Sequence, residues 1–296
     1  MRQPPAMLFC AGAVKSGTSW LYEYLRGHPE TYLRSIKELQ FFDRLHAGNL
    51  PGRIQSLDQE IAAFEAELET GTARWPILTL GQMGDRAEYK RIIQSGDAPI
   101  GAYLRYLTAG AEAQRLVGEM TPEYGLLPPE KMAEMTALAP DVRWIFLMRD
   151  PVARLWSHIR MLVRRSKAAP EDMARACEAK FNEVLAGKAR DVTLRGDYQA
   201  IHTRLTQAVR PEKRLVMFYE HLLTPSGVAQ VTDFLGLSRH PARLDRWVHE
   251  GQPVAMPGAL RDRARDWLWP QYAFVAQTLG LPPEWEAFPE FNSEVA

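Results

Sequence analysis

Short runs of consecutive apolar residues alternate along the chain with longer stretches in which apolar positions recur every three or four residues. Unbroken apolar runs are typical of strands buried on both faces, and the longer spacing is typical of helices with one buried face. Strands that alternate with helices favour an α/β fold with a central parallel sheet flanked by helices. The runs predict strands at 7–11, 115–120, 142–148 and 214–219, with a further short strand at 32–33.

The helices expected between these strands are bounded by glycine, proline and capping residues. Asp150 is a good N-cap and Pro151 a good first residue for a helix that runs to about residue 165. The segment 71–84, which has glycines at both ends and Trp75-Pro76 between them, is predicted to be a loop. Further helices are predicted at 18–26, 57–69, 85–94, 102–114, 129–138, 171–187, 197–209, 220–237, 241–250 and 262–280.

The composition is that of an ordinary globular protein without net charge. Apolar residues make up 46% of the 296 positions, and 36 basic residues balance 36 acidic ones. A neutral protein has no global field to attract nucleic acid, so no nucleic-acid partner is predicted and any anion site must be local. No apolar run approaches about 18 residues and no signal segment is visible, which predicts a cytoplasmic protein without a transmembrane segment. Cys10 lies in a predicted buried strand far from Cys177, so a disulfide is not expected.

The first predicted strand is followed by a glycine-bearing loop and then by a helix. This order suits phosphate binding, because glycines let backbone N–H groups approach an anion and a helix N-terminus adds partial positive charge. Gly12 and Gly17 have the spacing of a nucleoside-triphosphate loop, G-x4-G-K-[ST]. Thr18, however, stands in the place of the lysine, and Lys15 lies within the loop instead. The pattern therefore predicts a related anion cradle for a different donor, with Thr18 or Ser19 capping the helix.

The expected helix at 151–165 carries a cluster of cations. One face is apolar, no acidic residue occurs between Asp150 and Glu171, and guanidinium groups suit phosphate. The other face is either part of an anion site or a solvated basic surface; it carries Arg154, Ser157, Arg160, Met161 and Arg164, with His158 beside Arg154. Arg149 differs, because it follows a strand directly. The carboxyl ends of parallel strands meet at one rim of a sheet, so Arg149 is expected near the Lys15 loop.

Two motifs in this order resemble those of sulfotransferases that use 3′-phosphoadenosine 5′-phosphosulfate (PAPS). Residues 15–20, Lys-Ser-Gly-Thr-Ser-Trp, resemble the loop that binds the 5′-phosphosulfate, and residues 149–157 resemble the motif whose first arginine and last serine bind the 3′-phosphate. Similarity extends through 37–42, 119–124, 219–222 and 234–237, and is closest to heparan-type and bacterial sulfotransferases. The resemblance implies a three-layer sandwich related to P-loop kinases, with donor-binding residues Lys15, Ser16, Gly17, Thr18, Ser19, Trp20, Arg149 and Ser157.

The resemblance also implies how the sulfuryl group is transferred. Lys15 would stabilise charge on the leaving phosphate oxygen, and Glu38, from the Lys-Glu motif, would accept the proton of the acceptor. Lys37 and Phe41 are expected near the acceptor, and no metal is expected because no metal-ligand spacing is visible. His28 and His158 are weaker choices for the base. The acceptor is a hydroxyl or amine on a small molecule, lipid or saccharide, although Met120 replaces a basic residue common in enzymes that act on polyanionic sugars.

Several alternatives stay open at this point. We interpret residues 1–296 as one domain with insertions at about 45–114 and 165–200 that shape the acceptor site, although length alone also allows two domains. An ATP-dependent P-loop phosphotransferase is the enzymatic alternative, and a non-catalytic nucleotide-binding protein is the other. The sequence identifies neither the acceptor nor the oligomeric state.

Overall fold

A parallel sheet lies at the centre of the computed structural model, which describes residues 4–95, 100–166, 169–245 and 254–285. Its strand order is β2-β3-β1-β4-β5, and every neighbouring pair is parallel. The predicted strands and the parallel sheet are therefore confirmed, and β4 has the predicted bounds. The strands are β1 (Ala6–Cys10), β2 (Thr31–Leu33), β3 (Leu116–Gly118), β4 (Val142–Met148) and β5 (Arg214–Phe218).

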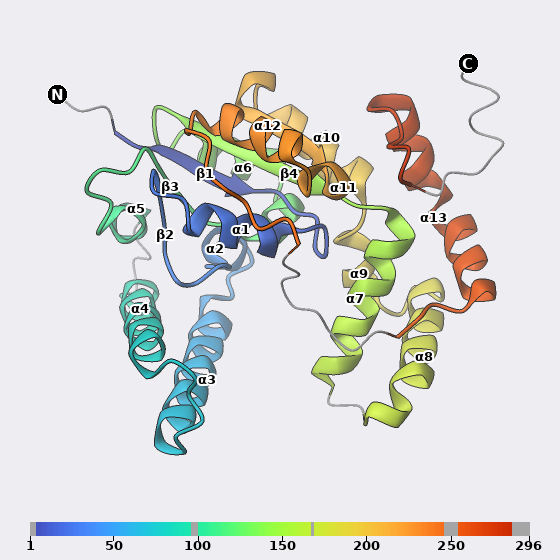
Figure 1. Cartoon of the computed structure of the whole chain (residues 1–296), viewed down its shortest axis with the longest axis horizontal. Helices are drawn as coiled ribbons and strands as arrows, with labels where there is room; N and C mark the ends of the chain where they lie inside the picture. The colour runs from blue at the N-terminus through green and yellow to red at the C-terminus, as the bar shows by residue number, and fades with distance from the viewer. Residues whose placement is uncertain (1–3, 96–99, 167–168, 246–253, 286–296) are drawn as a thin grey trace.

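Helices cover both faces of this sheet, so the fold is a three-layer α/β/α sandwich of the P-loop-kinase-like kind (Figure 1). Successive β1 residues alternate between two cores: Phe9 belongs to one, and Leu8 and Cys10 to the other. Cys10 and Cys177 are buried in different cores, and both are free thiols, as expected. The core around Leu8 includes α1 (Thr18–Arg26) and α12 (Pro225–Leu235). The core around Phe9 includes α6 (Pro129–Thr136), α7 (Pro151–Arg165), α8 (Met173–Leu185), α10 (Tyr198–Ala208) and α13 (Gly258–Thr278).

A helical hairpin extends away from the sheet between β2 and β3 (Figure 1). It follows α2 (Phe41–His46) and consists of α3 (Leu50–Glu69) and α4 (Pro76–Gln94), with α5 (Ile100–Thr108) leading back to the sheet. The loop predicted at 71–84 is wrong from Pro76 onward, because α4 begins there. Proline suits the first turn of a helix, and packing against α3, with an Arg86–Glu60 ion pair at 2.6 Å, outweighs the low helix propensity of the glycines.

Smaller differences concern the ends of helices. The helix predicted at 220–237 is two helices, α11 (Tyr219–Leu222) and α12, because the Thr224 hydroxyl accepts a hydrogen bond from Gly227 N at 3.0 Å and starts α12 anew. The short α9 (Arg190–Leu194) was not predicted. Of the helix predicted at 241–250, residues 241–245 are not helical and the rest lie outside the described residues. Among the described helices, none has the length and apolar character needed to cross a membrane.

Candidate active site

The loops that follow all five strands meet at one edge of the sheet, where they border a cavity of about 1260 Å³. Helix α3 forms one wall of this cavity and α7 another. The carboxyl edge of a parallel sheet is where such folds bind ligands, and β1 is the point at which the strand order reverses direction. The five loops contribute, in order, Lys15; Lys37 and Glu38; Glu123; Arg149; and Tyr219.

The loop after β1 is closed by Gly17, which is the N-cap of α1 in a left-handed conformation with φ of 91°. A Cβ at this position would lie 2.5 Å from Cδ2 of Tyr219, so the close packing of α11, which follows β5, against the loop also requires glycine. The prediction that Thr18 or Ser19 caps the helix is wrong, because neither precedes the first turn. The Thr18 hydroxyl instead accepts a hydrogen bond from Lys37 Nζ at 3.2 Å.

Positive charge accumulates around Lys15. Burial and the charges of the neighbouring Arg164 and Arg149 together lower the pKa of Lys15 to about 8. The pKa of Arg160 is likewise lowered by burial and by Arg149. Arg149 Nη1 donates to the carbonyl of Lys15 at 3.5 Å, and its guanidinium lies over the ring of Tyr219. Cations held close enough to oppose one another's charge make a site that suits a multiply charged anion.

Helix α7 begins at the predicted N-cap, and this start places Ser157 at the cavity. Asp150 Oδ1 accepts from Ala153 N at 2.8 Å, which confirms Asp150 as the N-cap, and Ser157 then lines the cavity two turns further on. Helical spacing places Arg154 and His158 on the basic face of α7, and the structure buries both side chains. The segment after α9 covers them, and Gly196 lies so near Arg154 that a Cβ there would be 2.2 Å from Nη2.

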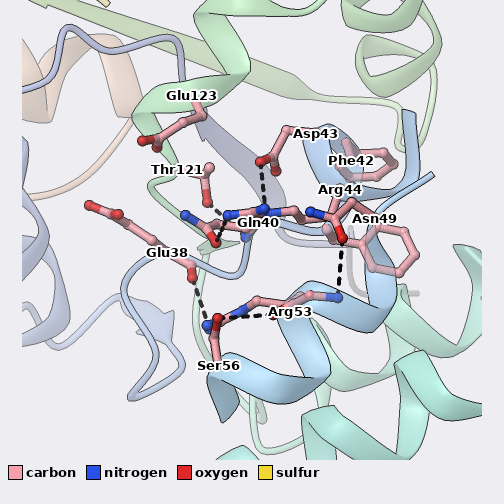
Figure 2. Close-up of polar contacts among 12 residues, drawn as sticks. Glu38, Gln40, Phe42, Asp43, Arg44, Asn49, Arg53, Ser56, Thr121 and Glu123 are labelled. Carbon is pink, nitrogen blue, oxygen red and sulfur yellow. Dashed lines mark hydrogen bonds and ion pairs between the residues drawn. The ribbon is translucent and has the colours of Figure 1, made fainter. Parts of the chain in front are cut away.

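The loop after β2 carries Lys37 and Glu38 into the cavity. Lys37 Nζ lies 2.6 Å from Glu38 Oε1 and also reaches Thr18, so it links the two loops. The Glu38 side chain is 37% exposed, whereas its backbone is held firmly. Arg53 of α3 donates to the carbonyls of Glu38 at 3.2 Å and of Leu39 at 3.1 Å. Figure 2 shows the Glu38 side chain extending away from Arg53, to the side on which Glu123 lies.

A buried carboxylate, Glu119, anchors the same loop from beneath. It accepts hydrogen bonds from Leu39 N and the Thr121 hydroxyl through Oε2, and from the hydroxyls of Tyr103 and Tyr124 through Oε1. Thr121 in turn accepts from Gln40 N at 3.1 Å, and Tyr124 from Phe41 N at 3.1 Å. Three successive backbone N–H groups are thus bound by Glu119 directly or through one hydroxyl. Burial raises the pKa of Glu119 to about 7.

Most of the residues predicted from the sequence line the cavity, namely Lys15, Gly17, Thr18, Ser19, Trp20, Lys37, Glu38, Arg149 and Ser157. Ser16 is fully buried and does not reach the lining. Phe41 does not line it either, since its ring stacks on Tyr103 with centroids 4.4 Å apart in the core. His28 lies elsewhere, with Nε2 bonded to the carbonyl of Ser238 at 3.0 Å. Glu119 and Tyr198 are structurally important residues that received no role from the sequence, although the Glu-x-Thr-Pro-x-Tyr pattern was visible.

The fold and the site together define an α/β protein in which clustered cations and a carboxylate share one cavity. The sequence profile described as the Sulfotransferase family matches residues 5–241, so the chain belongs to the sulfotransferase family. Solved structures with the same fold include a sulfotransferase from Alicyclobacillus acidocaldarius (21% identity, 93% of this chain and 96% of that chain, TM-score 0.58). The sulfotransferase domain of the Synechococcus PCC 7002 olefin synthase is also similar (20% identity, 95% and 96%, TM-score 0.53). No curated protein sequence matches this chain.

Proposed function

We propose that this protein transfers the sulfuryl group of PAPS to a hydroxyl or amine acceptor by in-line displacement. The observation that carries the proposal is the cation cluster around Lys15 and Arg149, which shares one cavity with the carboxylate of Glu38. PAPS is charged at both its 3′-phosphate and its 5′-phosphosulfate. A site with unneutralised cations on two separate loops suits such a donor better than it suits a single phosphate.

The residues present fit this donor. Lys15 and the backbone N–H groups of Gly17 to Ser19 would hold the 5′-phosphosulfate, since they lie at the N-terminus of α1. Arg149, which follows β4, and Ser157 of α7 would hold the 3′-phosphate. Trp20 lines the cavity beside the loop and completes the proposed nucleotide-binding set with Thr18.

The donor supplies an activated sulfuryl group, and residues of the chain take up the proton and stabilise the leaving phosphate. Glu38 accepts the proton of the acceptor as the new S–O or S–N bond forms. Lys15 donates a hydrogen bond to the phosphate oxygen on which negative charge develops as the old S–O bond breaks. Lys37 links the Glu38 carboxylate to Thr18, and so keeps the proton acceptor next to the loop that holds the donor. The cavity walls formed by 45–114 and 165–200 would then shape the acceptor site.

Titration calorimetry with adenosine 3′,5′-bisphosphate and with ATP tests the donor. We expect the bisphosphate to bind at least about 100-fold more tightly than ATP, with no need for magnesium; the reverse order would favour the ATP-dependent phosphotransferase. Lys15→Ala and Arg149→Ala should each abolish most of this binding, whereas the exposed Lys188→Ala should not. Tight binding with no sulfated product from any acceptor would favour a non-catalytic nucleotide-binding protein.

Glu38→Gln tests the proton acceptor separately. Turnover on a hydroxyl acceptor should fall by about 100-fold or more, because an amide cannot take up the proton, while bisphosphate affinity stays unchanged. Glu212→Gln, an exposed glutamate outside the cavity, is the matched control. Full activity of Glu38→Gln would show that another group is the base.

A further inference from the structure

One wall of the cavity contains three buried polar atoms that lack a hydrogen-bond partner within the described part of the chain. They are Oε2 of Glu123, Nε of Arg195 and Nε2 of His158, and all three residues line the cavity. None of them belongs to the proposed donor site. Buried polar atoms in folded proteins are nearly always hydrogen-bonded, whereas among the described residues these three make no hydrogen bond and only Arg195 Nε has an ion-pair contact, so the wall indicates groups that a bound molecule completes.

The fold holds these three side chains in place. Arg195 Nη1 is bonded to Asp191 at 3.0 Å, and its Nε lies 3.4 Å from Oε1 of Glu123. Beneath them, Arg154 lies 3.5 Å from Nδ1 of His158, and Gly196 packs directly on the Arg154 guanidinium. The wall is therefore built from α7, from the segment that follows α9, and from the loop after β3.

The hydrogen-bonding character of the wall follows from Arg154. A guanidinium only donates, so Nδ1 of His158 must accept, and a neutral imidazole then carries its proton on Nε2. The ring is neutral at physiological pH, because burial and the charge of Arg154 lower the pKa of His158 to about 3. This wall of the cavity therefore contains two N–H donors, from His158 and Arg195, and one carboxyl oxygen, from Glu123.

This wall lies on the same side as the proposed proton acceptor. Burial raises the pKa of Glu123, and so does the negative charge of Glu38. Figure 2 shows both side chains extending to the same side, away from α3. A molecule whose reacting hydroxyl contacts Glu38 would therefore bring its neighbouring groups to Glu123.

We infer that Glu123, Arg195 and His158 form an acceptor subsite for a second hydroxyl next to the one that is sulfated, as in a polyol or a glycoside. The inference rests on the proposed function and narrows its acceptor class. A hydroxyl donates to a carboxylate and accepts from an N–H at the same time, so it can satisfy both kinds of group. An anionic substituent would meet the two carboxyl groups, and a monohydroxy acceptor would leave all three polar atoms unpaired.

The test compares acceptors in transfer of ³⁵S from labelled PAPS. Methyl β-glucoside and propane-1,2-diol are the polyhydroxylated probes, and cyclohexylmethanol and propan-1-ol are their monohydroxy counterparts. We expect kcat/KM to be about 100-fold higher for the polyhydroxylated member of each pair, because a site built to hydrogen-bond a group discriminates strongly against its absence.

Variants of the subsite should remove this preference. Glu123→Gln, Arg195→Gln and His158→Gln should each raise KM for the glucoside about tenfold or more, with little change for cyclohexylmethanol. Affinity for adenosine 3′,5′-bisphosphate should not change, and circular dichroism should show that each variant is folded. Arg190→Gln, on the same short helix as Asp191 but outside the cavity, is the matched control.

Failure of the inference is distinguishable from failure of the proposed function. A protein that does not bind the bisphosphate would overturn both. Intact bisphosphate binding with equal use of the two members of each pair, or with sulfation of some other acceptor but of no probe, would overturn only the acceptor class. Unchanged KM in all three variants would overturn the assignment of the subsite residues.

Discussion

The hydroxyl of Tyr198 binds the backbone of Arg149 on both sides: it accepts from Arg149 N at 3.2 Å and donates to Arg149 O at 2.6 Å. Strand β4 ends at Met148, so Arg149 is the first residue without a strand partner. The Tyr198 hydroxyl, from α10, makes the hydrogen bonds to Arg149 N and O that a neighbouring strand would otherwise make. Tyr198 therefore fixes the position from which the Arg149 guanidinium reaches the cavity, without lining the cavity itself.

Removal of this hydroxyl should weaken donor binding. In Tyr198→Phe, two buried backbone groups lose their partner, so we expect unfolding free energy to fall by about 1–3 kcal/mol and bisphosphate affinity to fall about tenfold. Chemical denaturation and calorimetry measure the two effects. Tyr89→Phe is the control, because its hydroxyl binds the carbonyl of Leu39 at 3.0 Å on the acceptor side: it should lose stability and keep donor affinity. Equal losses of affinity would contradict a role specific to Tyr198.

Gly17→Ala should abolish donor binding. The new methyl group meets the Tyr219 ring and the left-handed backbone is strained, so the loop must move away from α11. Gly187→Ala separates the two effects, since Gly187 has φ of 73° but nothing within 4 Å of an added Cβ. The control should lose about 1 kcal/mol of stability and keep full bisphosphate affinity in calorimetry. Normal donor binding by Gly17→Ala would refute the geometry of the loop.

Donor affinity should depend on the protonation of Lys15. Its pKa is lowered to about 8, so the free site loses positive charge as pH rises through that value, and binding of an anion must then restore the proton. Bisphosphate affinity should therefore fall between pH 7 and pH 9.5. Lys15→Arg keeps its charge throughout this range, so its affinity should change much less with pH. Parallel pH profiles for the two proteins would exclude Lys15 as the titrating group.

Glu119→Gln should loosen the loop that carries Glu38. An amide offers one oxygen to the four donors that surround Glu119, so stability should fall by about 1–3 kcal/mol and turnover should fall with it. Pairing the variant with Tyr103→Phe, which removes one of the unmatched donors, should recover part of the stability. A Glu119→Gln protein with wild-type turnover would show that Glu38 does not depend on this anchor.

The raised pKa of Glu119 should also make the stability of the protein depend on pH in a definite direction. The pKa of Glu119 is about 7 in the folded protein and near 4.5 when unfolded, so between these values the native state holds a proton that the unfolded chain has lost. Wild-type stability, measured relative to Glu119→Gln, should therefore decline as pH rises from about 4.5 to 7, by about 1 kcal/mol for each pH unit.

The sheet was predictable from the sequence because its signal is local. Strand β4 is an unbroken apolar run, and the residues that end it, Asp150 and Pro151, mark a helix start independently of the rest of the fold. Helix α4 was not predictable in the same way. Its first half contains glycines and forms through contact with α3, which no pattern within the segment records.

The residues of the site also differ in whether a local sequence pattern predicts their position. Lys15, Glu38 and Arg149 stand in short motifs whose places at strand ends follow from the order of elements, and the cavity includes all three. Helical spacing places Arg154 and His158 opposite the apolar stripe, and nothing in that pattern predicts that they are buried. The segment that buries them arrives from about forty residues later in the chain, at Gly196, so their environment could be known only from the fold.

Arg53 connects α3, a wall of the cavity, to the loop that carries Glu38. It belongs to α3, which walls the cavity, yet it is buried and bonded to the backbone of the loop that presents Glu38. An acceptor too bulky for the cavity cannot push α3 outward without pulling that loop along. If Glu38 is the proton acceptor, as proposed, an oversized molecule that binds would displace Glu38 together with α3 and would be held out of register with the group that deprotonates it.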